Sequence, residues 1–312
     1  MIDCSKIDMR DSVFNELYKI ALNDKDVILI NADTPAFVLE KYILEMPKQY
    51  INTGVSEQSM ILASAGLAMS GKKVFIYSLI PFIALRCYEF IKVNICSMNL
   101  PVTIIGGGAG FSFSYDGPTH HAICDIALMR TLPEISIYNP SDSSIATTCI
   151  RNSYENNVPS YIRLDKGAHL TLNRDSLHGF SEVKSGKNIC IVSTGIMTHT
   201  AIDVANNLKQ HNFDISVIDL YRIKPLNEYD LLERLMEFDA IVTLEENSII
   251  GGIGSMISEL MIDNNLFLYL KRIALPDTQS FIYGSRNWLH KQYKIDSDSV
   301  AQNIINWYKE IL

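Results

Sequence analysis

The sequence predicts an α/β protein with two domains: a mostly parallel sheet with helices on both faces, followed by a smaller α/β domain. Two observations carry this prediction. Short apolar runs alternate with longer helix-like segments along most of the 312 residues, which is typical of parallel sheets with covered faces. A polar stretch with three glycines, at 165–187, interrupts the alternation and is typical of a linker. We therefore expect domains at residues 1–180 and 187–312.

The first domain is expected to alternate five buried strands with five helices. Runs rich in valine and isoleucine predict the strands, because β-branched side chains pack well on a pleated surface. These strands are expected at 27–30, 74–77, 102–105, 135–138 and 161–164. Helical periodicity predicts helices at 11–22, 56–70, 82–97, 123–130 and 141–153.

The same rhythm resumes after the linker and predicts the second domain. Strands are expected at 189–192, 215–218 and 240–243, with a last strand at 267–273. Helices are expected at 198–209, 227–236, 253–262 and 297–311. The run Gly251-Gly252-Ile253-Gly254 lacks the spacing of a dinucleotide-binding fingerprint, so we interpret it as a glycine-rich helix start.

Composition excludes several classes of protein. A formal net charge of -8 does not suit a general nucleic-acid binder, which needs a basic face to neutralise phosphates. The six cysteines lie far apart without a C-x-x-C pair, so neither a metal site nor a disulfide framework is expected. Residues 1–10 contain no apolar signal core, and the apolar run 74–85 is too short to span a membrane. We expect a cytoplasmic protein.

The densest group of reactive side chains lies at Asp116-Gly117-Pro118-Thr119-His120-His121, after the glycine run 106–110. A carboxylate, a hydroxyl and imidazoles surround a Gly-Pro turn, and loops that leave strand ends often carry chemistry in α/β proteins. Taken alone, the stretch fits an ordinary turn or an active-site loop equally well.

Glu57 is a second candidate, because it lies at the expected start of a helix with Ser56 as a plausible N-cap. It fits either a surface carboxylate near the helix dipole or a buried functional group. The helix is rich in alanine, serine and glycine, so close packing at a subunit interface is expected. Phe82 follows Pro81 at another helix start, where an aromatic side chain is more often part of the core than a platform for a cofactor.

Taken in order, these segments resemble the C-terminal half of transketolase. The resemblance runs nearly end to end, and its specificity lies in the order and spacing of the motifs. The matching segments are 9–11, 30–33, 54–58, Phe82 with Arg86, 116–120, 137–142, 191–195, 218–226 and 243–252.

The resemblance implies a thiamine diphosphate-dependent enzyme with a pyrimidine-binding domain at 1–180 and a transketolase C-terminal domain at 187–312. The family's Gly-Asp-Gly motif, which with a later Asn holds the diphosphate and a divalent metal, does not occur in this sequence. The expected chain is therefore one subunit of a split transketolase. A partner subunit with that motif would bind Mg²⁺, and two copies of each chain would form an α2β2 assembly.

The resemblance also assigns roles to individual residues. Glu57 would hydrogen-bond the pyrimidine ring, Phe82 would stack on that ring, and Asp33 would help to position the cofactor. Asp116 and His120 would bind hydroxyls of the donor sugar, and His120 would also move a proton. In this assignment Glu57 and His120 are catalytic. Arg10 and Lys166 are the remaining substrate-binding candidates.

Several positions depart from the family pattern. Gly108 stands where sugar-phosphate enzymes of the family carry a phosphate-binding histidine, Phe37 replaces a serine, and Lys166 replaces an arginine. Leu79 stands where an aromatic residue is usual. Lysine offers a point charge, whereas the planar guanidinium of arginine can form two parallel hydrogen bonds to a phosphate. Tight binding of a terminal phosphate is therefore not expected. A nucleotide-linked or unphosphorylated sugar is the expected acceptor.

Three alternatives stay open. The β subunit of a 2-oxo acid dehydrogenase shares the domain pair but lacks the stretch from Asp116 to His120. 1-Deoxyxylulose 5-phosphate synthase is also similar, but it usually carries all three domains in one polypeptide. A non-catalytic partner subunit of the same fold is the third alternative, and Glu57, Asp116 and His120 argue against it.

Overall fold

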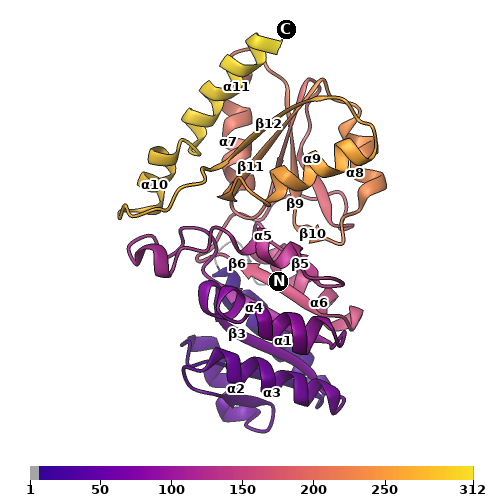
Figure 1. Ribbon diagram of the computed structural model, residues 1–312, viewed down its shortest axis with the longest axis vertical. Coiled ribbons are helices and arrows are strands. Elements are labelled where there is room, and N and C mark those ends of the chain that lie inside the picture. Colours follow the sequence, from indigo (N-terminus) through magenta and orange to yellow (C-terminus); the bar gives the residue numbers. More distant parts are fainter. Residues whose placement is uncertain (1–6, 312) are drawn as a thin grey trace.

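The computed structural model describes residues 7–311, which form two lobes stacked along the long axis of the molecule (Figure 1). The lower lobe is built on a seven-stranded sheet and the upper lobe on a five-stranded sheet. No helix of the described chain is both long enough and apolar enough to cross a membrane.

The larger sheet has the strand order β10-β5-β6-β4-β3-β1-β2. Six of its strands are parallel, and only β10, at the edge, runs antiparallel to its neighbour β5. The strands are β1 (Val27–Asn31), β2 (Tyr50–Asn52), β3 (Lys73–Leu79), β4 (Val102–Gly107), β5 (Ser136–Tyr138), β6 (Ser160–Leu164) and β10 (Arg222–Lys224). The five strands expected in this domain are all present, and β2 and β10 are additional.

Both faces of this sheet are covered, as the continuous apolar runs predict. In β1, Ile28 and Ile30 belong to one buried cluster, whereas Val27 and Leu29 belong to a second cluster on the other face. The covering helices are α1 (Met9–Asn23), α2 (Glu40–Glu45), α3 (Glu57–Met69), α4 (Tyr88–Ile91), α5 (Asp125–Arg130) and α6 (Ser143–Asn156).

The smaller sheet has the strand order β12-β11-β8-β9-β7. Its strands are β7 (Phe180–Lys184), β8 (Ile189–Ser193), β9 (Ile215–Leu220), β11 (Ala240–Ser248) and β12 (Tyr269–Leu275). Its helices are α7 (Met197–Lys209), α8 (Glu228–Leu235), α9 (Ile253–Asp263), α10 (Arg286–Tyr293) and α11 (Ser297–Ile311). A third apolar cluster fills the space between this sheet and α7, α10 and α11.

The structure differs from the sequence expectation in two places that matter for the site. The helix expected at 82–97 is broken into a π-helical turn, η3 (Pro81–Leu85), the short α4, and a second π-helical turn, η4 (Lys92–Cys96). The stretch at 165–187 is only partly a linker, because it contains β7, which pairs antiparallel with β9. Its polar side chains fit an edge strand, which has one unpaired side.

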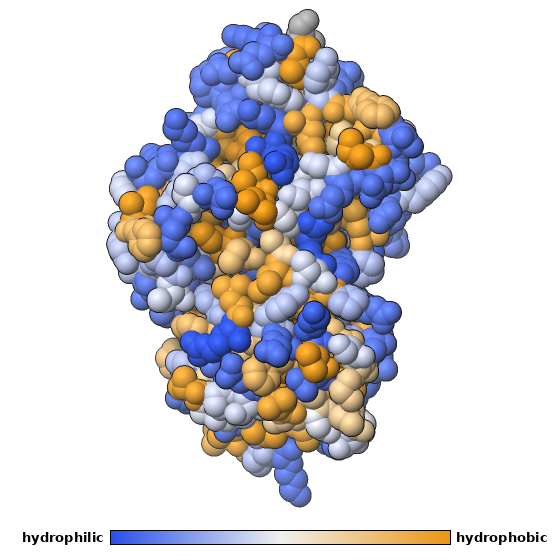
Figure 2. All heavy atoms as spheres, in the orientation of Figure 1, coloured by the Kyte–Doolittle hydropathy of each residue, from blue (hydrophilic) through white to orange (hydrophobic). Residues whose placement is uncertain are grey.

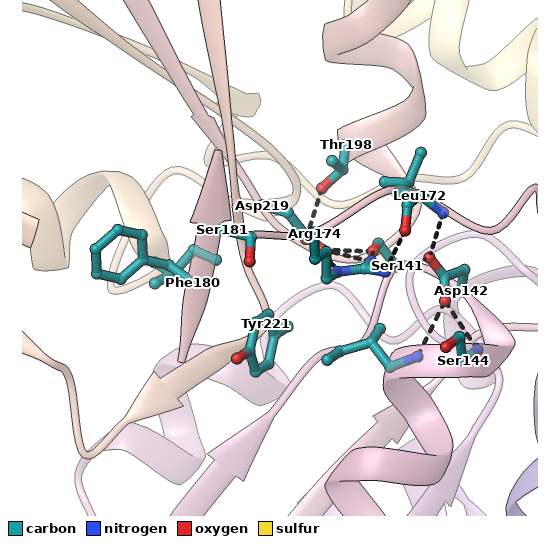
Figure 3. Close-up of polar contacts among 12 residues, drawn as sticks. Ser141, Asp142, Ser144, Leu172, Arg174, Phe180, Ser181, Thr198, Asp219 and Tyr221 are labelled. Atoms are coloured by element: carbon teal, nitrogen blue, oxygen red, sulfur yellow. Dashed lines mark hydrogen bonds and ion pairs between the residues drawn. The ribbon is translucent and has the colours of Figure 1, made fainter. Parts of the chain in front are cut away.

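Arg174, in the segment between the sheets, ties the two lobes together (Figure 3). Its side chain is 5% exposed and pairs with Asp142 and Asp219, each at 2.8 Å. Asp142 also caps α6 by accepting hydrogen bonds from the backbone N–H groups of Ser144 and Ile145. Because Asp142 starts a helix of the larger domain and Asp219 lies on β9, one guanidinium pairs with a buried carboxylate from each domain.

Candidate functional site

Glu57 is the first residue of α3, and the structure buries its side chain at 3% exposure. The hydroxyl of Ser78, on β3, donates to Oε1 at 3.3 Å, and Nη1 of Arg86 donates to Oε2 at 3.0 Å. Ser56 occupies the N-cap position, but its hydroxyl donates to the carbonyl of Thr53 instead of capping the helix. A carboxylate in this setting is held in place by two side chains from neighbouring elements.

Phe82 lies half-buried in the π-helical turn η3, in contact with a cation and an imidazole. The guanidinium carbon of Arg86 is 4.7 Å from the ring centroid, and the His120 ring packs edge-on at 5.3 Å. Since Arg86 also binds Glu57, three of the expected site residues, Glu57, Phe82 and His120, are linked through direct contacts. They come from three separate segments that follow β2, β3 and β4.

The loop after β4 carries Asp116 and His120 on one turn. Gly117, at φ +73°, allows this turn, and the side chain of Asp116 is exposed beside it. Oγ1 of Thr119 lies 2.9 Å from Nδ1 of His120, which leaves Nε2 as the ring atom for another partner. The stretch is therefore more than a solvent-exposed turn, because its imidazole packs against Phe82.

Arg10 and Lys166 both line a hollow of about 270 Å³ at the ends of β3, β4 and β6. Leu79, Gly108 and Phe113 line the same hollow. The ammonium of Lys166 lies 5.3 Å from the centroid of the Phe113 ring, a distance typical of a cation–π contact. Two cations and two carboxylates, Asp8 and Asp165, therefore line a partly apolar hollow.

Gly108 has φ +87°, and a Cβ atom at this position would collide with the Phe113 ring. Any side chain here would be strained by the backbone and would also have to displace the aromatic ring. The Phe113 ring thus occupies the space that a side chain at position 108 would need.

Asp33 lies in the exposed loop after β1 and lines a second hollow of about 620 Å³, together with Arg10 and Phe37. Its Oδ1 accepts a hydrogen bond from Nδ2 of Asn52 at 3.2 Å, and φ is +53° at this residue. Arg10 lines both hollows, so they adjoin. The Asp33 carboxylate thus lies beside the substrate-binding candidate Arg10.

The hydroxyls of Thr34 and Ser78 are site features that the sequence reasoning missed. Oγ1 of Thr34 lies 3.3 Å from Oγ of Ser78, which in turn donates to Glu57. This chain of hydroxyls connects the loop that holds Asp33 to the buried carboxylate. Neither residue belongs to a recognisable motif, so only the three-dimensional structure reveals the connection.

The residues present fit the pyrimidine half of thiamine diphosphate. A buried carboxylate, Glu57, has an aromatic face, Phe82, close by, and a flat basic heterocycle needs both kinds of group. Within residues 7–311 there is no group of three or more His, Cys, Asp or Glu side chains arranged to hold a metal ion.

A buried glutamate next to an aromatic ring, at the carboxyl edge of a parallel sheet that a second α/β domain follows, is the arrangement of a thiamine diphosphate-dependent enzyme. Residues 5–169 match the family model for the transketolase pyrimidine-binding domain, and residues 180–300 match the model for the transketolase C-terminal domain. The chain belongs to the transketolase family. The family, the fold class and the assignment to transferases expected from the sequence are thereby confirmed.

Two curated relatives differ in how much of their length this chain spans. It is 32% identical to 1-deoxy-D-xylulose-5-phosphate synthase of Caldanaerobacter subterraneus subsp. tengcongensis, over 97% of this chain but only 50% of that protein. It is 29% identical to one of the subunits of apulose-4-phosphate transketolase from Actinobacillus succinogenes, over 89% of this chain and 91% of that protein.

A solved structure of a split-gene transketolase, an inactive β4 tetramer, is also similar. It has a TM-score of 0.87 and 27% identity, and the match covers 96% of this chain and 98% of that chain. A mutant transketolase from Pichia stipitis shares the fold at a TM-score of 0.80 and 19% identity, with 46% of its chain covered.

Proposed function

We propose that this chain is the pyrimidine-binding subunit of a split, thiamine diphosphate-dependent transketolase. The enzyme transfers a two-carbon ketol unit from a ketose donor to a carbonyl acceptor, and a separate chain supplies the diphosphate- and Mg²⁺-binding half. The observation that carries the proposal is the buried Glu57 in contact with Arg86 beside Phe82 and His120. The near end-to-end similarity to proteins named as single subunits of apulose-4-phosphate transketolases supports the split.

In the proposed site, each residue of this chain has a separate role. Bound thiamine diphosphate supplies a nucleophilic ring carbon that the protein cannot provide. The Glu57 carboxyl group would hydrogen-bond the pyrimidine ring, in a pocket from which water is largely excluded. Phe82 offers its ring face for stacking, and Asp33 helps to position the cofactor.

Asp116 and His120 bind hydroxyls of the donor sugar. With Nδ1 of His120 next to the Thr119 hydroxyl, Nε2 is the atom that we assign to the substrate and to moving a proton. The contact with Phe82 fixes the plane of the imidazole, so the proton carrier and the stacking platform keep one relative orientation.

The acceptor is not a simple pentose phosphate in our proposal. Arg10 and Lys166 provide positive charge at the smaller hollow, but Gly108 and Phe113 replace a further phosphate-binding side chain with an apolar wall. A nucleotide-linked or unphosphorylated sugar fits such a site. Relatives named for apulose 4-phosphate and for 6-deoxy-6-sulfo-D-fructose support a substrate outside the common pentose phosphates. High catalytic efficiency on ribose 5-phosphate would contradict this part of the proposal.

The partner chain has an apolar surface available on α3. From Val55 to Ser70 the only charged residue is the buried Glu57, and the exposed face includes Leu62 and Met69. Figure 2 shows apolar residues spread over the lower lobe, where α2 and α3 lie. Small side chains on this helix allow close approach of another backbone, which fits an α2β2 assembly.

Reconstitution tests the proposal. The chain is co-expressed with a candidate chain that carries Gly-Asp-Gly followed by Asn, and ketol transfer is measured with and without thiamine diphosphate and Mg²⁺. We expect a stable complex whose activity requires both. Failure to form a complex with any such chain would overturn the split, and turnover of a 2-oxo acid instead of a ketose would favour the dehydrogenase alternative.

A further inference from the structure

Arg286, the first residue of α10, reaches from the C-terminal domain into the pyrimidine-binding domain. Its Nη1 donates to Oδ1 of Asp165 at 2.6 Å and its Nη2 donates to Oδ2 at 2.7 Å, so the guanidinium binds this carboxylate in a bidentate manner. It also donates to the carbonyl of Ala109 and to the hydroxyl of Ser112, each at 3.3 Å. One side chain thus holds two segments of the other domain.

Two side chains of the C-terminal domain, Glu246 and His290, hold Arg286 in place. Nε of Arg286 donates to Oε1 of Glu246 at 2.9 Å, Nη2 contacts Oε2, and His290 binds the same carboxylate. Although burial acts to raise it, Arg286 and His290 hold the pKa of Glu246 well below its usual range. Glu246, on β11, therefore stays charged and keeps the guanidinium in place.

The two segments that Arg286 holds form walls of the smaller hollow. Ala109 directly follows Gly108, and Lys166 directly follows Asp165, which itself lines the hollow. At Gly110, with φ +56°, a Cβ atom would collide with Glu246, so the loop lies directly against the C-terminal domain. The same domain supports the far end of the loop, because Tyr283 packs where a side chain on Gly117 would lie.

The charges around the hollow add a second reason for this contact. Two carboxylates, Asp8 and Asp165, line the hollow beside Arg10 and Lys166. Without Arg286, the Asp165 carboxylate would be left unpaired at the edge of the hollow and would repel an anionic ligand. Arg286 shares its positive charge between Asp165 and Glu246, and so it offsets part of this repulsion.

We infer that Arg286 is a positioning residue for the substrate pocket: it fixes the loop 108–121 and the Asp165–Lys166 segment, and it offsets the negative charge of Asp165 beside the pocket. The inference rests on the proposed function for the identity of the pocket. It gives the C-terminal domain a direct part in substrate binding.

Two substitutions and a matched control test it. Arg286→Met removes the charge but keeps the apolar stem, and Arg286→Lys keeps the charge but loses the fork. Arg174→Met is the control, because Arg174 also joins the two domains through buried carboxylates but contacts neither the loop nor the hollow. Thermal unfolding of all three variants monitors general loss of stability.

Hydrogen exchange of the chain alone is the first measurement, since it needs neither partner nor cofactor. We expect Arg286→Met to speed exchange of the amides of 108–121 by about tenfold or more, with a smaller effect for Arg286→Lys and none there for Arg174→Met. Equal exchange in this loop for wild type and Arg286→Met would overturn the inference, whatever the substrate is.

Steady-state kinetics of the reconstituted complex are the second measurement, with fructose 6-phosphate and fructose as donors that differ in charge. We expect Arg286→Met to raise KM for the phosphorylated donor by roughly tenfold and to leave KM for fructose and kcat within about twofold. A fall in kcat alone for both donors, as from general destabilisation, would overturn it. If the reconstituted complex transfers a ketol unit from no ketose donor, the proposed function fails, while the exchange result still decides the role of Arg286.

Discussion

Glu57 shows how a local signal and a long-range contact combine in one residue. Its position at the start of α3 is predictable from Ser56 and the small residues that follow. Its burial is not, because that depends on Ser78 and Arg86, which lie 21 and 29 residues further along the chain. The family resemblance supplied the functional interpretation, and the structure supplies the contacts that hold the carboxylate.

Substitution of Glu57 by glutamine tests its role in the reconstituted enzyme. In the proposed mechanism the Glu57 carboxyl group hydrogen-bonds the pyrimidine ring, and an amide cannot exchange a proton there, so we expect kcat to fall by about 100-fold or more. Steady-state assays at saturating thiamine diphosphate provide the measurement. Glu155→Gln, at an exposed carboxylate on α6, should leave kcat unchanged. Full activity of Glu57→Gln would refute the mechanism.

Lys166 allows a substitution that should improve binding instead of impairing it. A guanidinium matches a phosphate with two parallel hydrogen bonds, whereas an ammonium offers a point charge. We expect Lys166→Arg to lower KM for ribose 5-phosphate several-fold and Lys166→Met to raise it. Neither change should affect KM for ribose, the uncharged control. Equal effects on both sugars would show that Lys166 does not sense the phosphate.

Elements with a strong local signal were the predictable ones. The buried parallel strands are continuous apolar runs, so they were found from the sequence, although several extend further than expected. β7 was missed because it is an edge strand with polar residues, and α10 was missed because its sequence has little apolar periodicity. The breaks at η3 and η4 were missed because residues 82–97 have the composition of an ordinary helix. Two of these unpredicted elements matter for the site, because η3 carries Phe82 and α10 begins with Arg286.

The start of α9 offers a pH-dependent test at the scale of one element. The Glu245 carboxylate accepts hydrogen bonds from the backbone N–H groups of Ile253 at 2.9 Å and Gly254 at 2.8 Å, so it caps this helix. Burial raises the pKa of Glu245 from the reference value 4.5 to about 7, against the opposing effect of these two hydrogen bonds.

The raised pKa of Glu245 decides how the free energy of unfolding changes with pH. Between pH 4.5 and about 7 the folded state binds more protons than the unfolded state at Glu245, so its contribution to the free energy of unfolding falls as pH rises. The full effect is on the order of 3 kcal/mol at most. Glutamine does not titrate, and it loses one of the two capping bonds, at a cost of about 1 kcal/mol.

We therefore expect Glu245→Gln to be less stable than wild type at pH 4.5 and to approach or exceed wild-type stability at pH 7.5. Denaturant unfolding of both proteins across this range measures the difference. Because His121 and the other titrating groups are common to both proteins, their effects cancel. A stability difference that stays constant with pH would show that Glu245 titrates normally.

In the whole molecule, the contacts between the two lobes could not be predicted from the sequence. Arg174 and Arg286 each join carboxylates from both domains, over separations of up to 121 residues. β10 comes from the second half of the chain and completes the first sheet. Such pairings have no local signature, because any arginine can pair with any carboxylate that the fold brings near. Buried ion pairs and β10 therefore join the two domains, even though the sequence divides them at a linker.

The exposed face of α3 makes a prediction about assembly. Leu62 is 48% exposed on a face without charged neighbours from its own helix, so an arginine there would place an unpaired charge in an apolar interface. We expect Leu62→Arg to weaken binding to the diphosphate-binding chain by at least about tenfold while the melting temperature of the isolated chain changes little. Titration calorimetry or analytical ultracentrifugation measures the association. Ile262→Arg, at a 66% exposed position of α9 in the other lobe, is the matched control and should bind as wild type does. If the control weakens assembly and Leu62→Arg does not, the partner chain docks on the C-terminal domain, and the α3 face must serve another purpose.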